Sequence, residues 1–403
     1  MKISLRINRL DDFKRIILKG FVFLGPMGNL LVPQVFSHAF RAYYFILMLF
    51  PLFFISCWQR MWKICLCFIP FFIYSFVFID VSSSADAYQR VLLFLSQFMF
   101  VLGAGFYLNS EQEKIELIFL YLKSFFISLL VGYVFFIGFY SSLISYNWIE
   151  HFSVLAQTGY GLLRFGPGSY PNEYGIVTSF VLSVLTWILC FPNCEIPLSR
   201  KFIHIFYVLA LVALLLTTTR AAYLSYLFAL FYIAVKSRKF IRVLVISLLT
   251  MTGVILVLGL VGVNIWNVLF IGFHINNLEQ GSLSERLIIW RQAQDLFLDQ
   301  PWTGNGFFSW GPAHNVYLQL VVELGLLGVC LLMGGVVLAI LTKRYWIFRR
   351  RSMVWHEIFH QNIVKIGLMH VLWFAMSNHN LNHHMTWFVL LLCFKKDSQR
   401  QIT

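Results

Sequence analysis

Long apolar runs separated by short polar segments recur along the whole chain. A helix needs about 20 largely apolar residues to cross a bilayer, so these runs predict about 12 transmembrane helices. We therefore expect an all-α integral membrane protein in which residues 1–403 form a single polytopic membrane domain. The predicted spans are 16–36, 42–58, 61–79, 91–108, 115–140, 174–191, 203–219, 221–235, 243–263, 316–341, 362–377 and 381–394.

Two of these spans, 203–219 and 221–235, are almost continuous in sequence. As one helix they would be ~50 Å long, well beyond the ~30 Å hydrocarbon core of a membrane. We therefore predict that the helix breaks within Thr217-Thr218-Thr219-Arg220. The break would place Arg220 at a membrane face, where a charge between packed spans needs a partner.

The positive charges predict the orientation. Most lysines and arginines lie in segments that are cytoplasmic if the N-terminus is inside, and this also makes the C-terminus cytoplasmic. The outside then keeps six basic residues, all arginines: Arg41, Arg90, Arg164, Arg220, Arg286 and Arg291. Charged residues make up only 12% of the chain, whereas soluble domains carry about 25%. The net charge of +14 is scattered over short loops, so no nucleic-acid partner is expected.

Two of the predicted periplasmic segments are long, 141–173 and 264–315. The second contains SLSERLIIWRQAQDLFL, whose apolar positions recur at helical spacing and predict a short amphipathic helix on the surface of the bundle. Ser282 or Ser284 is the expected N-cap, and Pro301 with Gly304 and Gly306 is expected to end the helix and turn the chain back. The predicted apolar stripe comprises Leu287, Trp290, Ala293 and Leu296 or Phe297.

The sharpest local pattern is His314-Asn315 followed by an apolar run with Gly325 and Gly328. On a continuous helix these glycines share one face with His314, and their small size would let another helix approach closely. A histidine at the outer mouth of such a helix could act as a general base, with Asn315 beside it. The alternative is an interfacial histidine that only caps its helix.

The outer arginines suggest an anionic ligand, because the guanidinium fork binds phosphate oxygens at two points. Arg286 and Arg291 lie about 140° apart on the predicted surface helix, so at most one faces inward, and the sequence leaves open which. Asn172 is a candidate N-cap for the helix from Tyr174, whose free amides would favour an anion. The alternative for each arginine except Arg220 is pairing with a lipid headgroup phosphate, because a charge in a turn between two packed spans is costly without a partner.

Two other groups of polar residues are weighed against these. His379, His383 and His384 resemble metal ligands, but no cysteine or carboxylate accompanies them and a polar turn explains them equally well. No metal or other cofactor is therefore expected. Glu323 lies within a span, where a carboxylate is a functional suspect, but on a continuous helix it faces away from His314 and would pair with a polar group on another helix.

These residues resemble the O-antigen polymerase and O-antigen ligase superfamily, whose signature is matched by His314-Asn315, Gly325 and Gly328. SERLIIWRQAQDLFLDQPWTGNGFFSW, RFGPGSYPNEYG and TTTRAAYLSYLF are similar to further segments of that family. The resemblance implies a bacterial inner-membrane glycosyltransferase that uses an undecaprenyl-diphosphate-linked glycan at its periplasmic face. It also implies that His314 is the base and that Arg220, Arg164 and Arg286 or Arg291 hold the diphosphate.

From this resemblance we expect an O-antigen polymerase that joins lipid-linked repeat units by inverting, metal-independent glycosyl transfer. Its partners would be undecaprenyl-diphosphate-linked oligosaccharides as donor and acceptor, membrane lipid and a chain-length regulator. The close alternative is an O-antigen ligase, which transfers the finished glycan to lipid A-core. A flippase or transporter of the same lipids is a lesser alternative, because the sequence lacks repeated halves and charges along a central cavity.

Overall fold

The computed structural model describes residues 2–31, 44–79, 85–108, 110–150, 155–157, 163–191, 197–237, 240–260, 282–310, 314–341, 355–377, 381 and 383–394. Nearly all of these residues are helical. The elements are α1 (Lys2–Met27), the 3₁₀ turn η1 (Gly28–Leu31), α2 (Tyr44–Leu47), α3 (Phe50–Val77), α4 (Ala85–Tyr107), α5 (Glu111–Tyr140), α6 (Tyr146–Glu150), β1 (Leu155–Gln157), β2 (Leu163–Phe165), α7 (Pro171–Cys190), α8 (Arg200–Thr217), α9 (Arg220–Lys236), α10 (Phe240–Leu260), α12 (Ser282–Asp299), α13 (Val316–Leu341), α14 (Trp355–Ser377) and α15 (His384–Leu392).

Among the described residues, five helices are long and apolar enough to cross a membrane: Ala87–Tyr107, Glu111–Tyr140, Pro171–Cys190, Arg200–Thr217 and Val316–Ala339. This agrees with the expected all-α membrane class, and the total number of spans stays a prediction. One feature was not expected. β1 and β2 form a small antiparallel pair within the first of the two long segments.

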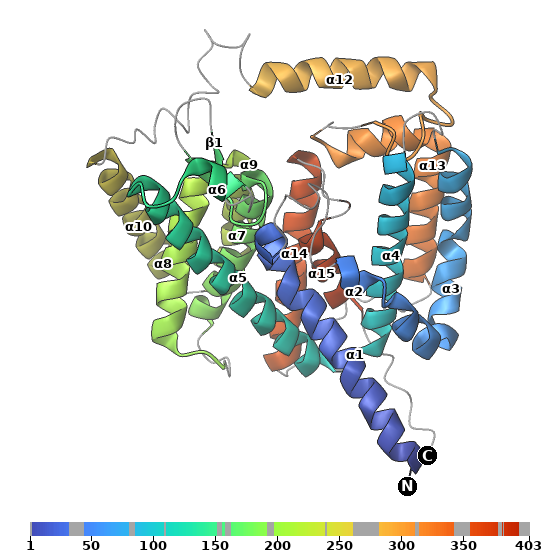
Figure 1. Ribbon diagram of the computed structural model, residues 1–403, viewed down its shortest axis with the longest axis horizontal. Coiled ribbons are helices and arrows are strands. Elements are labelled where there is room, and N and C mark those ends of the chain that lie inside the picture. The colour runs from blue at the N-terminus through green and yellow to red at the C-terminus, as the bar shows by residue number, and fades with distance from the viewer. Residues whose placement is uncertain are drawn as a thin grey trace.

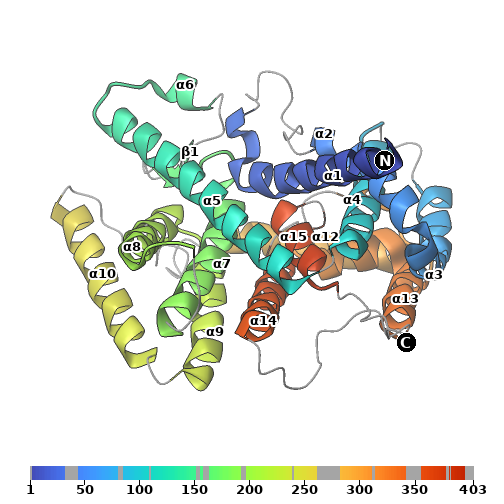
Figure 2. The same cartoon turned by 90° about the horizontal axis from the view of Figure 1, so that it is seen from below.

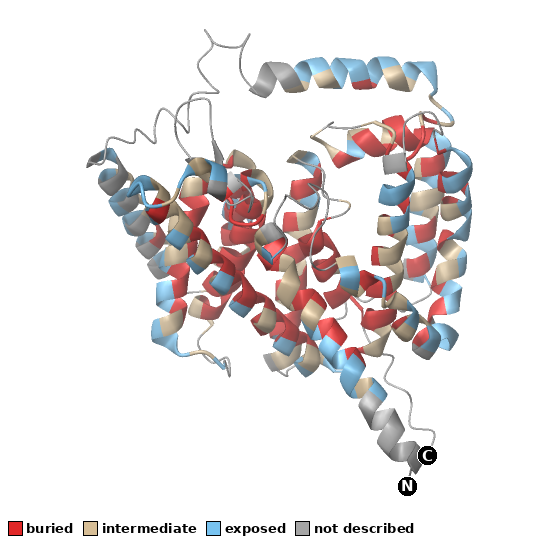
Figure 3. Cartoon of the chain, viewed as in Figure 1, coloured by how far each residue is buried: buried red, intermediate tan, exposed pale blue. Residues whose placement is uncertain are grey.

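The helices pack side by side with α7 near the centre. Seen from below, α3 and α13 lie at one edge and α10 at the opposite edge, with α7, α14 and α15 between them (Figure 2). α7 is buried along almost its whole length, and α8, α9 and α14 pack against it (Figure 3). Both long polar segments, represented by α6 with β1 and by α12, lie at the same end of the bundle (Figure 1).

The separation of spans 42–58 and 61–79 is wrong, because Phe50–Val77 is one helix, α3. The polar residues between the two apolar runs, such as Gln59 and Lys63, are exposed and do not interrupt the helix. One buried stripe continues past them at helical spacing and packs against α4 and α13. The stripe consists of Phe53, Cys57, Met61, Ile64, Phe68 and Phe71. Since this face is unbroken, nothing favours a turn at Arg60.

The predicted break between α8 and α9 is confirmed. α8 ends at Thr217, and Thr218 adopts a left-handed conformation with φ of 51°. The Thr217 hydroxyl donates to the Leu214 carbonyl at 2.7 Å and accepts from the Thr219 amide at 3.3 Å. These local bonds compete with a continuing helix. Arg220 is the first residue of α9.

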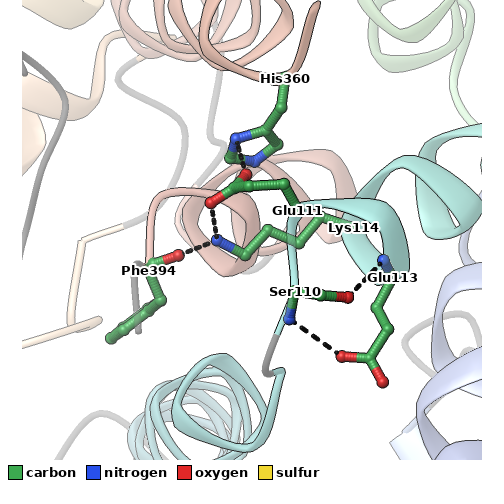
Figure 4. Close-up of polar contacts among 6 residues, drawn as sticks. All are labelled: Ser110, Glu111, Glu113, Lys114, His360 and Phe394. Carbon is green, nitrogen blue, oxygen red and sulfur yellow. Dashed lines mark hydrogen bonds and ion pairs between the residues drawn. The ribbon is translucent and has the colours of Figure 1, made fainter. Parts of the chain in front are cut away.

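At the opposite end of the bundle a buried polar network ties three helices together (Figure 4). Lys114 of α5 donates to the carbonyl of Phe394 and to Glu111, and Glu111 is also paired with His360 of α14. Ser110 and Glu113 form a capping box at the start of α5. Because a buried charge needs a partner, this network fixes where α5, α14 and the end of α15 meet.

Candidate active site

α13, which follows His314, is not a continuous helix. At Gly325 the backbone has φ of 59° and ψ of −177°, which breaks the helix into two limbs. The first limb lies beneath α12, at an angle to the second (Figure 1). The predicted face shared by His314, Gly325 and Gly328 on one helix is therefore wrong. Position 325 needs glycine because its backbone conformation is essentially restricted to that residue. Position 328 needs glycine because a Cβ atom there would collide with the Tyr74 ring.

The loop that follows α12 pairs with the broken backbone of α13. Leu326 and Leu327 donate to the Pro301 and Trp302 carbonyls at 2.9 and 3.1 Å. Asn305 and Gly306 donate to the Val322 and Glu323 carbonyls at 3.0 and 2.9 Å. The loop thus supplies hydrogen-bond partners to amides and carbonyls that lose their helical partners at the break. Such groups need partners in an apolar surrounding.

Tyr74 of α3 closes the same break from the other side. Its hydroxyl lies 2.6 Å from the Thr303 carbonyl and 2.8 Å from the Leu324 carbonyl. Nothing in the sequence near Tyr74 indicated this contact, because its partners lie more than 200 residues further along the chain. Gly304 and Gly306, expected to turn the chain, have φ of 70° and 102°, as a tight reversal requires.

His314 lies just before α13, with a left-handed backbone at φ of 48°. The helix is capped by Asn315, whose side-chain oxygen accepts from the Leu318 amide at 3.1 Å. The capping role considered for His314 therefore belongs to its neighbour. A non-glycine residue in this conformation is uncommon and clusters at functional sites, which leaves His314 as a candidate base.

Arg164 of β2 is held by three hydrogen bonds at the break between α8 and α9. Its Nε donates to the Thr217 carbonyl at 2.9 Å, and its Nη2 donates to Asn172 Oδ1 at 2.7 Å and to Thr219 Oγ1 at 3.1 Å. The N-cap assignment of Asn172 is wrong, because Tyr170 is the N-cap and Pro171 begins α7. Asn172 instead orients Arg164.

Three of the predicted arginines act on one another electrostatically. Burial lowers the pKa of Arg164, and the positive charge of Arg220 lowers it further. Burial also lowers the pKa of Arg286, and Arg220 again adds to this effect. Arg164 on β2 and Arg286 on α12 therefore both lie near enough to Arg220 at the start of α9 to sense its charge. A cluster of like charges in a partly buried place favours binding of an anion.

Only one of the two arginines of α12 belongs to this cluster. Arg286 is half-buried and shares a face with Ala293, which is 0% exposed, whereas Arg291 is exposed. The predicted apolar stripe is wrong at two positions, because Leu287 and Trp290 are 51% and 40% exposed, while Ile289 lies on the half-buried side. The helix itself and its end at Asp299 match the prediction, but Ser284 lies inside it and is not its N-cap.

The outer end of α14 connects the His314 side of the site to the Arg220 side. Tyr317, in the first turn of α13, donates to the Leu372 carbonyl at 3.3 Å. The indole Nε1 of Trp373 donates to the Ala221 carbonyl at 2.8 Å. Two adjacent residues of α14 therefore contact the helices that begin beside the proposed base and at Arg220.

The sequence was compared with models of known protein families. Residues 205–333 match the model of a family described as O-antigen ligase. This match is consistent with the O-antigen polymerase and ligase superfamily over residues 205–333. The matched O-antigen ligase region runs from within α8 to within α13 and holds Arg220, Arg286, Arg291 and the His314 signature. Arg164 and Asn172 lie before it. No curated protein matches the chain.

The chain is thus a multi-pass membrane protein that carries a region of a glycosyltransferase-like enzyme family. Within this O-antigen ligase region, Glu323 does not pair with another helix as expected. Its two carboxylate oxygens accept from the Phe308 amide at 2.9 Å and from the Gln319 side chain at 2.8 Å. We expected Glu323 to face away from His314 because we assumed that both lie on one continuous helix. That assumption is wrong, since α13 begins only at Val316.

The histidines weighed as metal ligands have other partners where the structure describes them. His383 caps α15 by accepting from the Met385 amide and lies 3.9 Å from Glu173. His384 is buried and contacts the Phe21 carbonyl at 2.8 Å. His379 lies outside the described residues. Within the described part of the chain no three metal-ligating side chains come together.

Proposed function

We propose that this protein is an O-antigen polymerase that joins undecaprenyl-diphosphate-linked repeat units at the periplasmic face of the bacterial inner membrane. The observation that carries the proposal is that Arg164 is hydrogen-bonded at the break where Arg220 begins α9, and that α14 contacts both the first turn of α9 and the first turn after His314. The charge of Arg220 also acts on Arg164 and Arg286. A diphosphate carries enough negative charge to offset several arginines, and a lipid-linked one reaches the outer end of a membrane bundle from the bilayer.

The chemistry follows from the charges. A sugar hydroxyl of the acceptor attacks the anomeric carbon of the donor while the bond from that carbon to the diphosphate oxygen breaks. His314 takes the hydroxyl proton, and the arginines stabilise the negative charge that develops on the leaving diphosphate. Attack from the side opposite the leaving group inverts the anomeric centre. Arginines in this role make a divalent metal unnecessary.

The second candidate is the O-antigen ligase, in which lipid A-core provides the acceptor hydroxyl. One observation favours it, because the matched family is described as O-antigen ligase. The donor, the base and the arginine cluster would be the same in both enzymes. The acceptor and the product therefore have to separate them. A chain-length regulator is a partner only of the polymerase.

The test is the lipopolysaccharide ladder of a strain that lacks this protein. The polymerase predicts core carrying one repeat unit, whereas the ligase predicts bare core. Complementation with His314→Ala should leave that defect in place, because loss of a general base lowers the rate by ~10²–10⁴-fold. A near-normal ladder with the variant at wild-type abundance would refute the assignment of the base, and an unchanged ladder in the deletion strain would refute both functions.

A further inference from the structure

Glu323 is an acidic side chain buried inside the mostly apolar helix α13. Its side chain is 0% exposed, and a charge in such a place persists only with good partners. One oxygen accepts from the Phe308 amide at 2.9 Å, and the other accepts from Gln319 Nε2 at 2.8 Å. The backbone of Trp310 also lies within hydrogen-bonding reach of the carboxylate. Glu323 therefore holds the loop before His314 and the helix after it.

The loop held by Glu323 has an unusual backbone. Gly304, Gly306 and Phe308 have φ of 70°, 102° and 62°, and for Phe308 this conformation is strained because it has a side chain. Such strain persists only where the surroundings over-determine it. The Phe308 amide is the group that the carboxylate accepts from, so Glu323 fixes the strained residue directly.

The same hydrogen bond closes a segment of the chain that contains the proposed base. Phe308 and Glu323 are 15 residues apart, and His314 lies between them. After His314, Asn315 caps α13 and Gln319 lies one turn along the same limb, bonded to the other oxygen of Glu323. His314 thus sits between two elements that one carboxylate joins.

We propose that Glu323 is a positioning residue for His314, because its carboxylate joins the turn at Phe308 to the first limb of α13 and so fixes the backbone that carries the histidine. This inference rests on the proposed function of His314 as the base. The arginine cluster lies on β2, α9 and α12, so loss of the Glu323 contacts should affect turnover more than donor binding.

Three substitutions separate a positioning role from a role of the charge itself. Glu323→Gln keeps both contacts, because its oxygen accepts from Phe308 and its NH₂ donates to Gln319 after that amide flips. Glu323→Asp keeps the charge but is one methylene too short, and Glu323→Leu removes both contacts. Positioning predicts that the glutamine variant stays within about tenfold of wild type, while the other two lose about 10²-fold in kcat with little change in donor KM.

The charge alternative predicts the reverse order, with aspartate better than glutamine, and that result would overturn the proposal. Glu116→Gln is the matched control, since Glu116 is an exposed carboxylate on α5 and its loss should change neither parameter. Transfer is measured with purified protein and a lipid-linked oligosaccharide, at concentrations normalised to folded protein.

Hydrogen exchange of residues 304–310, measured by mass spectrometry on the same proteins, does not depend on the reaction. The amides of Gly304, Asn305, Gly306, Phe308 and Ser309 are hydrogen-bonded. Glu323→Leu and Glu323→Asp should exchange faster there, and Glu323→Gln should stay protected. Unchanged exchange in all three would refute the positioning role. Faster exchange with full activity would show that the turn is held as proposed but that His314 is not the base, which separates the two failures.

Discussion

Replacing Gly325 by alanine should destabilise the protein far more than the same change at Gly334 in the same helix. A Cβ atom at Gly325 would lie 2.5 Å from the Gly304 nitrogen, 2.5 Å from the Trp302 oxygen and 2.6 Å from the Trp302 carbonyl carbon. These are backbone atoms of the paired loop, so they cannot move aside as a flexible side chain would.

The magnitude follows from two effects. Alanine at φ of 59° and ψ of −177° lies in a region that is essentially restricted to glycine, which costs about 1–3 kcal/mol. Overpacking against fixed atoms costs about 1–3 kcal/mol more. The sum, about 2–6 kcal/mol, is a large fraction of the ~5–15 kcal/mol by which folded proteins are typically stable. We expect a clearly lower melting temperature in detergent and lower abundance in the membrane.

Gly334→Ala is the matched control, because it lies on the second limb of α13 and a Cβ there would meet no atom within 4 Å. Alanine has the higher helix propensity, so this variant should be neutral or more stable by up to ~1 kcal/mol. Gly304→Ala should resemble Gly325→Ala, and the double variant should cost less than the sum, since both changes separate the same two backbones. Equal melting temperatures for Gly325→Ala and Gly334→Ala would refute the break in α13.

The remaining predictions concern the leaving group. Arg220→Lys should lose almost as much transfer activity as Arg220→Ala, because an ammonium cannot make the two-point contact of a guanidinium. Arg291→Ala, on the exposed side of α12, is the control. Full activity of the lysine variant would mean that only the charge at position 220 matters. Transfer by the purified protein should survive excess EDTA, since the arginines provide the positive charge. Loss of transfer in EDTA with recovery in magnesium or manganese would contradict the arginine mechanism.

The parts of the fold that the sequence predicted are those set by local chemistry. The break at Thr217–Arg220 follows from helix length and from hydroxyls that bond their own backbone. The helix of residues 282–299 was expected from the helical spacing of its apolar residues, although that spacing named the wrong face at Leu287 and Trp290. Neither depends on a distant partner.

The errors have different origins. Apolar periodicity does continue past Arg60 through Met61 and Ile64, and the prediction of two spans gave more weight to the polar residues Gln59 and Lys63. Apolar periodicity has a real limit at α13. It cannot show that α13 breaks at Gly325, since the carbonyls that replace the helical bonds belong to Pro301 and Trp302. Asn172 had good N-cap chemistry, but Arg164 uses its side-chain oxygen instead.

The arrangement of the two halves of the candidate site also depends on a segment outside the motif. The matched O-antigen ligase region, 205–333, holds the His314 signature, Arg220 and Arg286, yet α14 lies beyond it at Trp355–Ser377. α14 is the helix whose adjacent residues Leu372 and Trp373 contact the first turns of α13 and α9. The matched region thus contains the proposed base and arginines, whereas a helix outside that region contacts the first turns of the two helices that begin beside them. Shortening the Trp373 side chain to alanine should therefore loosen the contact of α14 with the first turn of α9 without touching the matched signature.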